Sequence, residues 1–180
     1  MKDAFGADAN QNIQDDLNWL ERLGRKIPGF RGYYEKRDRR EADQLLRNTL
    51  VGRFEQVRLE FSQVHEMVSS DIILAIDLAE PLGRIDTQMM GLIGKIKDAP
   101  QGYSSFFNPV KVDAEKLDEI YRFDYTMMTH GEEIATAVQT LITATENGEE
   151  IKPLIRQLDK EVKEANAAFA SRQDVITGMG

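Results

Sequence analysis

Apolar residues recur at three- and four-residue intervals along most of the chain, the spacing that places side chains on one face of an α-helix. The earliest such series predicts a short helix over residues 13–23, which Gly24 and Pro28 should end. After a turn rich in glycine and aromatic residues, a second series predicts a long helix from about residue 36 to residue 69. The first third of the chain is therefore expected to be mainly helical.

The same rhythm continues through three further helices. Ser70 or Asp71 can cap the third helix, in which Pro81 should cause a kink or a restart. Asp113 can cap the fourth, and the sequence NGE at Asn147 should end it before a fifth helix begins. Strand patterns are absent, apart from a short VKV at residues 110–112.

Each long series predicts the buried seam of one helix. The seams are Leu50, Phe54, Val57, Phe61, Val64 and Val68; Leu78, Leu82, Ile85, Met89, Leu92 and Ile96; Leu117, Ile120, Asp124, Met127, Gly131, Ile134, Val138 and Leu141; and Ile151, Ile155, Leu158, Val162, Ala165 and Phe169. Short breaks join the second helix to the third and the fourth to the fifth, so each pair should fold back on itself. The predicted fold is all-α, an elongated antiparallel four-helix bundle with an additional short N-terminal helix.

Composition bounds this fold to one domain spanning residues 1–180, with residues 1–9 and 176–180 frayed at its ends. Hydrophobic residues make up 41% of the chain and charged residues 30%, which is ordinary for a globular protein. No apolar run approaches the ~20 residues that cross a bilayer, and the N-terminus lacks a signal-peptide pattern, so a cytoplasmic location without a transmembrane segment is expected. Without cysteine, disulfides, thiolate catalysis and cysteine-bound metals are excluded.

The net charge of −8 is unevenly distributed. From residue 22 to residue 58 there are 11 Lys or Arg and 5 acids, so this segment is basic and the remainder strongly acidic. Neighbouring helices can neutralise each other, or the polarity can attract an anionic partner or orient self-association. Nucleic acid is not expected as a partner, because the acidic remainder would repel a phosphate backbone.

A di-metal site of the kind found in some helical bundles needs Glu-x-x-His pairs on facing helices. Ser62 stands three residues before His65, and Met127 three before His130, so this motif is missing. His130 with Glu133 leaves a minor geometric possibility, but neither a metal nor a cofactor is predicted.

Asp124 is the sharpest local irregularity, because an ionised carboxylate in an apolar seam needs a partner. Counted along the helices from the loop end, Asp124 lies at about the level of Arg47 and Asp86, so Arg47 is the preferred counter-ion and Arg84 the second choice. A structural ion pair is favoured over a catalytic or ligand-binding acid. Gly131, farther along the same seam, is expected to permit close helix approach.

Two loops rich in aromatic residues are predicted to meet at one end of the bundle, beside a cationic run. Arginines at a helix N-terminus can bind anions, although no phosphate-binding glycine motif is present. The alternative is that the aromatic residues plug the end of the core. The candidate partner- or anion-binding residues are Phe30, Arg31, Tyr33, Tyr34, Arg37, Arg39, Arg40, Tyr103, Phe106 and Phe107.

The segment IPGFRGYYEKRDRREADQLLR, with the later APQGYSSFF and FDY, is similar to a group of bacterial helical proteins that begin IPG-x-x-GY and continue with a basic RRE-x-D-x-LLR run. The resemblance extends over much of residues 27–141. It implies a helical fold, and it implies no particular activity, cofactor or catalytic residue.

The sequence therefore favours a non-enzymatic interaction or scaffold protein that uses its basic, aromatic end to bind a protein partner or a second copy of itself. The alternative is an enzyme or sensor with a polar ligand or metal site in the core around Asp124. No nucleophile, base and orienting group can be assembled from the sequence.

Overall fold

The computed structural model describes residues 39–99 and 114–177, with side chains described for residues 44–99 and 123–171. These residues form four helices without a strand, namely α2 (Arg39–Ser69), α3 (Ile72–Asp98), α4 (Ala114–Glu146) and α5 (Lys152–Thr177). The all-α prediction is confirmed for this part of the chain. The helix predicted over residues 13–23 and the VKV segment lie outside it.

The chain divides into two units, Met1–Leu46 and Arg47–Gly180. The boundary falls inside α2, so most of α2 and all of α3, α4 and α5 belong to the second unit.

The four helices pack against each other as two neighbouring hairpins. Helix α5 packs against both α3 and α4. Arg58 and Asp86 join α2 to α3 through two hydrogen bonds of 2.7 and 2.9 Å. Gln139 of α4 donates a 3.0 Å hydrogen bond to Glu60 of α2. Each helix therefore has two neighbours, and its remaining side faces away from the others.

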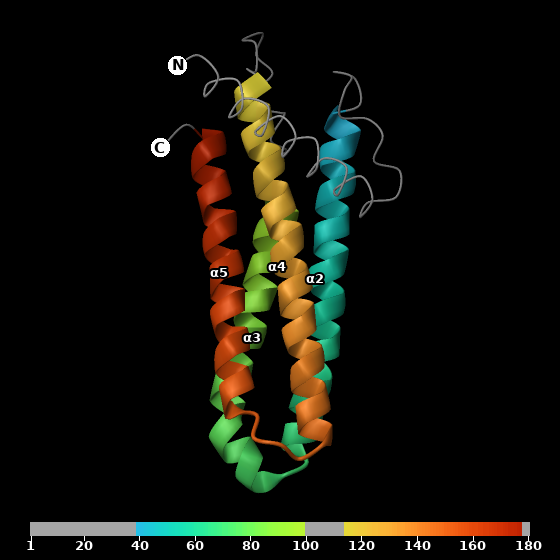
Figure 1. The fold of residues 1–180 in the computed structure, drawn as a ribbon, viewed down its shortest axis with the longest axis vertical. Coiled ribbons are helices and arrows are strands. Elements are labelled where there is room, and N and C mark those ends of the chain that lie inside the picture. Colours follow the sequence, from blue (N-terminus) through green and yellow to red (C-terminus); the bar gives the residue numbers. More distant parts are fainter. Residues whose placement is uncertain (1–38, 100–113, 178–180) are drawn as a thin grey trace, which may run out of the picture. The chain divides into compact units, whose positions relative to one another are not determined.

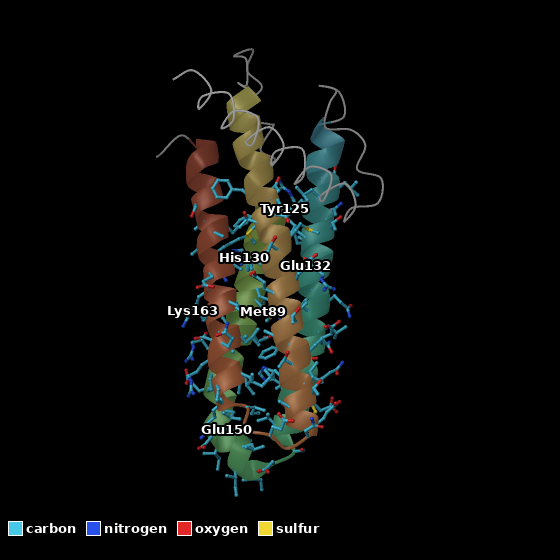
Figure 2. All side chains as sticks on the ribbon, viewed as in Figure 1. Met89, Tyr125, His130, Glu132, Glu150 and Lys163 are labelled. Atoms are coloured by element: carbon cyan, nitrogen blue, oxygen red, sulfur yellow. The ribbon has the colours of Figure 1, made fainter. Side chains whose placement is uncertain are left out.

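The core contains the seams that the three- and four-residue spacing predicts, together with further apolar residues beside them, such as Val51, Ile93 and Ile142. Every predicted seam residue of α2, α3 and α5 is buried, as are those of α4 from Asp124 onward. Aliphatic side chains at this spacing interlock between long helices and supply most of the folding free energy. The labelled Met89 in Figure 2 lies among the four helices, where it is 1% exposed.

Gly131 is buried against α2, as expected from its place in the seam. A Cβ added there would lie 3.6 Å from a carbon of Arg53 and 3.7 Å from the ring of Phe54. These are ordinary van der Waals distances. An alanine would therefore fit, and the close approach expected from the sequence does not require glycine at this position.

The turn between α2 and α3 is fixed by Asp71, one of the two predicted caps. Its carboxylate accepts hydrogen bonds from the backbone amides of Ile73 (2.9 Å) and Leu74 (3.2 Å). These amides have no partner within the first turn of a helix, so the cap satisfies them. Helix α3 then continues through Pro81 to Asp98 as a single helix, so the predicted restart does not occur.

The connection between α4 and α5 contains Gly148, which has a φ of 69°. The Gly148 amide donates to the carbonyl of Thr145 (3.1 Å), and the Glu149 amide donates to that of Ala144 (2.9 Å). This hydrogen-bond pair is the Schellman termination, which favours glycine at the left-handed position. The predicted break at NGE is confirmed.

Both turns lie at the same end of the second unit, as Figure 1 shows. Lys152 at the start of α5 forms a 2.8 Å ion pair with Asp77 in the second turn of α3. Along the described helices, none has the length and apolar character required to cross a bilayer.

Candidate functional site

The most unusual surface in the described part of the chain is the side of α3 that faces away from the other helices. We call it the outward face of α3. Positions separated by seven, four and seven residues fall on one line of an α-helix. Ile76, Gly83, Thr87 and Gly94 form such a line. The outward face comprises Ile72, Ile73, Ile76, Ala79, Glu80, Gly83, Thr87, Met90, Gly91 and Gly94.

Bulky apolar side chains project into solvent from the first half of this face. Ile72 and Ile73 are each 77% exposed, and Ile76 is 78% exposed. Met90 in the second half is 53% exposed. Scattered apolar surface residues are normal, but a contiguous group on one helix face is typical of a contact surface.

The second half of the face is instead shallow, because its glycines carry no side chain. A Cβ added at Gly83, Gly91 or Gly94 would meet nothing within 4 Å. These glycines are therefore not needed for packing inside the fold. Glycine in the middle of a helix costs roughly 0.5–1 kcal/mol relative to alanine. These positions therefore lower the stability of α3, and no packing contact within the described fold requires glycine there.

Polar groups on the outward face are engaged within α3 itself. The hydroxyl of Thr87 donates a 2.8 Å hydrogen bond to the carbonyl of Gly83. Glu80 forms a 2.5 Å ion pair with Arg84, one turn farther along. Between Ile72 and Gly94 the face thus offers apolar contact area more than free hydrogen-bonding groups.

Ion pairs on both flanks of α3 hold the outward face in position. On the α2 side, the hydrogen bonds from Arg58 to Asp86 raise the pKa of Arg58. On the α5 side, Asp159 accepts a 2.6 Å hydrogen bond from Lys163 and lies 3.6 Å from Arg84. Burial alone would raise the pKa of Asp159, but these cations and a hydrogen bond from Gln88 together lower it.

The structure describes each of the three residues of the predicted polar core site, Asp124, Arg47 and Asp86. Asp124 is buried, at 2% exposure. Arg47 donates a hydrogen bond to the backbone carbonyl of Ala99. Asp86 pairs with Arg58, eleven residues or roughly 16 Å along α2 from Arg47. The pairing of Asp124 with Arg47 stays a prediction.

The basic, aromatic end falls almost entirely outside the described residues. Arg39 and Arg40 begin α2, but their side chains are not among those described. The remaining members of the set lie outside the described ranges; they are Phe30, Arg31, Tyr33, Tyr34, Arg37, Tyr103, Phe106 and Phe107. The convergence of the two aromatic loops is therefore a prediction that the fold does not test.

A groove of about 440 Å³ runs between α4 and α5. Its lining includes Thr136, Thr140 and the carboxylates of Glu132, Glu133 and Glu161. Both hydroxyls donate to backbone carbonyls one turn earlier, at 2.9 Å each. They are consequently engaged in holding their own helix, and neither is positioned as a nucleophile by a neighbouring base.

The two histidines occupy separate environments. The ring of His65 lies edge-on to Phe61, with the ring centres 5.1 Å apart. His130 Nδ1 lies 3.2 Å from a carboxylate oxygen of Glu133. Among the described residues, no group of three or more His, Asp or Glu side chains is placed to hold a metal ion.

Comparison of the chain with protein-family models, with curated proteins and with solved structures finds no match.

The outward face of α3 is the feature that the sequence pattern did not reveal. Its isoleucines sit beside seam residues in the sequence IILAIDL, where they look like part of an apolar run. The available signal was their register, because Ile72, Ile73 and Ile76 fall off the seam that begins at Leu78. Apolar residues outside a helix seam indicate a second contact surface.

Proposed function

We propose that this chain is a non-enzymatic interaction protein, built as an antiparallel four-helix bundle with an additional N-terminal helix, that binds a protein partner through its outer surface. One observation carries the proposal, namely the exposure of Ile72, Ile73 and Ile76 by 77–78% on the outward face of α3. Burying a side chain of this size against a partner is worth roughly 1.5–3 kcal/mol, which favours association.

The basic, aromatic end remains a second candidate surface for the same function. Arg39 and Arg40 at the start of α2 belong to it, together with the aromatic residues of the two predicted loops. Arginine and aromatic side chains are enriched at the centres of protein interfaces. The two surfaces differ in chemistry, so mutations can separate them.

The test is a cross-linking pull-down with the full chain as bait, carried out with two variant pairs. Ile73→Glu with Ile76→Glu removes the apolar contact of α3, whereas Arg39→Glu with Arg40→Glu reverses the cationic run. Loss of a specific partner, including a differently tagged copy of the chain, with unchanged helicity supports the surface that was altered. If both variant pairs still bind the same partners as the unaltered chain, the proposal is contradicted.

The alternative function is that of an enzyme or a sensor. The observation that favours it is the burial of a carboxylate, that of Asp124, in the described core. Replacing Asp124 by Leu distinguishes the two. Equal or greater stability with loss of a ligand response indicates a functional site, because a structural carboxylate that is removed usually leaves its buried partner unpaired. Unfolding indicates a structural role.

A further inference from the structure

We propose that the partner of the outward face of α3 is a second copy of this chain, bound so that the two α3 helices lie antiparallel. This inference rests on the proposed interaction function and names its partner. It follows from the shape of the face, from the distribution of its charge and from the chemistry around its apolar end.

The first argument is shape. The face has projecting side chains in its first half and open glycines in its second half, so one copy carries both the projections and the spaces that would receive them. A two-fold interface requires a surface that complements itself. Antiparallel pairing meets this requirement, because it brings the first half of one helix against the second half of the other.

The register of the pairing follows from the helix periodicity. With the two-fold axis near Ile85, Ile76 of one copy lies over Gly94 of the second copy, and Gly83 lies over Thr87. Ala79 then meets Met90 on one edge of the face. At these three levels a larger residue faces a smaller one, which is the arrangement that lets helices pack closely. Ile72 and Ile73 lie at the level of Asp98 and Lys97 of the second copy.

The second argument is charge. From Asp71 to Gly83 there are three acids and no base, whereas from Arg84 to Asp98 there are three bases and two acids. Antiparallel pairing sets the acidic half against the half with a net positive charge, and parallel pairing would set the acidic halves side by side. The opposed helix dipoles also favour the antiparallel arrangement.

The chemistry around the exposed isoleucines disfavours a lipid surface as the occupant. Asp71 and Asp77 border them on α3, and the α4–α5 turn contributes Glu149 and Glu150 at the same end, where Figure 2 labels Glu150. Anionic membranes repel such a cluster. A second copy instead brings Lys95 and Lys97 to the level of the acidic half; within one chain Lys95 donates a 3.1 Å hydrogen bond to Asn166, and Lys97 lies 3.8 Å from Glu55.

The experiment measures the molar mass of the full chain by sedimentation equilibrium over a wide range of concentration. The unaltered chain should form a dimer that dissociates on dilution. Ile76→Glu should weaken the dimer by roughly tenfold or more, because it buries a charge in the apolar contact. Leu59→Glu on α2 is the matched control, because Leu59 is also exposed (64%) but lies off this face, and it should leave the dimer unchanged.

A second variant separates association from folding. Gly94→Gln fills the space that would receive Ile76, so it should weaken the dimer while the thermal midpoint of the monomer stays equal or rises, because glutamine favours a helix more than glycine does. Gly52→Gln on α2 is its control, since a Cβ there also meets nothing within 4 Å. It should raise or preserve the midpoint and leave the dimer intact.

The orientation is tested by thiol cross-linking, because the chain has no cysteine of its own. A mixture of Ala79→Cys and Met90→Cys chains should cross-link with a short bis-maleimide, whereas each variant alone should not. Parallel pairing would give the opposite result and would overturn the proposed geometry.

Failure of this proposal is distinguishable from failure of the proposed function. A chain that stays monomeric at every concentration, yet loses a different protein partner when Ile76 is replaced by Glu, refutes the second copy and keeps the interaction function. Equal effects of Ile76→Glu and Leu59→Glu refute the assigned face. If the chain stays monomeric and its binding to every partner is unchanged by the substitutions on both surfaces, both proposals are refuted.

Discussion

The outer sides of α3 and α5 face solvent in different ways although their inner sides are built alike. Along α5 the exposed side chains are mostly charged or polar, and Lys160–Glu164 and Lys163–Asp159 form pairs one turn apart, at 3.6 and 2.6 Å. Figure 2 shows Lys163 on the outer side of α5. Along α3 the corresponding side carries isoleucine, methionine and glycine.

The difference shows that burial inside one chain does not account for all of its apolar residues. A charged outer side keeps a helix hydrated and discourages association. The outward face of α3 carries one charged residue, Glu80, over about six turns at 3.6 residues per turn. Its inner side makes the same kind of core as α5, so folding alone does not require the outward face to be apolar.

The largest effects should come from the inner sides and should be alike on both helices. Ile85→Ala on α3 and Leu158→Ala on α5 each remove a fully buried side chain (0% exposed) and should lower the free energy of unfolding by about 2–5 kcal/mol. Ile76→Ala on the outward face should change it by less than roughly 0.5 kcal/mol. Urea unfolding of dilute protein measures all three. A large loss for Ile76→Ala in dilute monomer would show that the residue contributes to the fold itself.

Removing the cap of α3 should have a smaller effect. Asp71→Ala deletes the acceptor for the Ile73 and Leu74 amides and should destabilise the chain by about 1 kcal/mol. Asp71→Ser keeps an acceptor and should restore most of the loss. Thermal unfolding followed by circular dichroism measures both. Equal losses for the two variants would mean that the side chain acts through its charge and not as a cap.

The ion pairs that join α5 to α3 should make stability depend on pH. The pKa of Asp159 is lowered from its ordinary value of 3.8, so its contribution is present above that value and is lost as the pH falls through the folded-state pKa. Asp159→Asn should cost about 1 kcal/mol at pH 7, and the difference from the unaltered chain should shrink below about pH 4. Urea unfolding across this pH range tests it.

Glu164→Gln is the control for Asp159→Asn, because the Glu164 side chain is 53% exposed and its replacement should change the free energy of unfolding little. If the loss of unfolding free energy in Asp159→Asn stays constant down to the lowest pH, the loss is caused by packing and not by charge.

The seams, a cap at Ser70 or Asp71 and a break at the NGE that begins with Asn147 could be predicted because each depends on residues within one helix or one turn. Periodicity tells which side chains share a face, and local hydrogen bonding tells where a helix begins and ends. The N-terminal helix and the aromatic loops lie outside the described residues and stay predictions.

The partner of Asp86 could not be predicted in the same way, because it depends on how two helices are aligned. Counting from the far loop placed Asp86 level with Arg47, whereas the structure pairs it with Arg58. Counting outward from the connecting turn at Ser70 gives twelve residues to Arg58 and sixteen to Asp86, a mismatch of only about 6 Å at ~1.5 Å per residue. Errors in axial level are smallest near the turn that joins the helices.

The smallest expected difference between α3 and α5 concerns one exposed pair on each. On α3 the acid precedes the base, with Glu80 before Arg84, and on α5 the base precedes the acid, with Lys160 before Glu164. An acid that precedes its base along the helix is the more favourable arrangement, because it agrees with the helix dipole. Glu80→Gln should therefore cost more than Glu164→Gln, within the roughly 0.2–0.5 kcal/mol that such pairs contribute. Thermal midpoints of the dilute monomer at low ionic strength would resolve the order, and high salt should reduce both losses. A larger loss for Glu164→Gln would show that cross-helix contacts of α5, and not the order along each helix, decide the strength of these pairs.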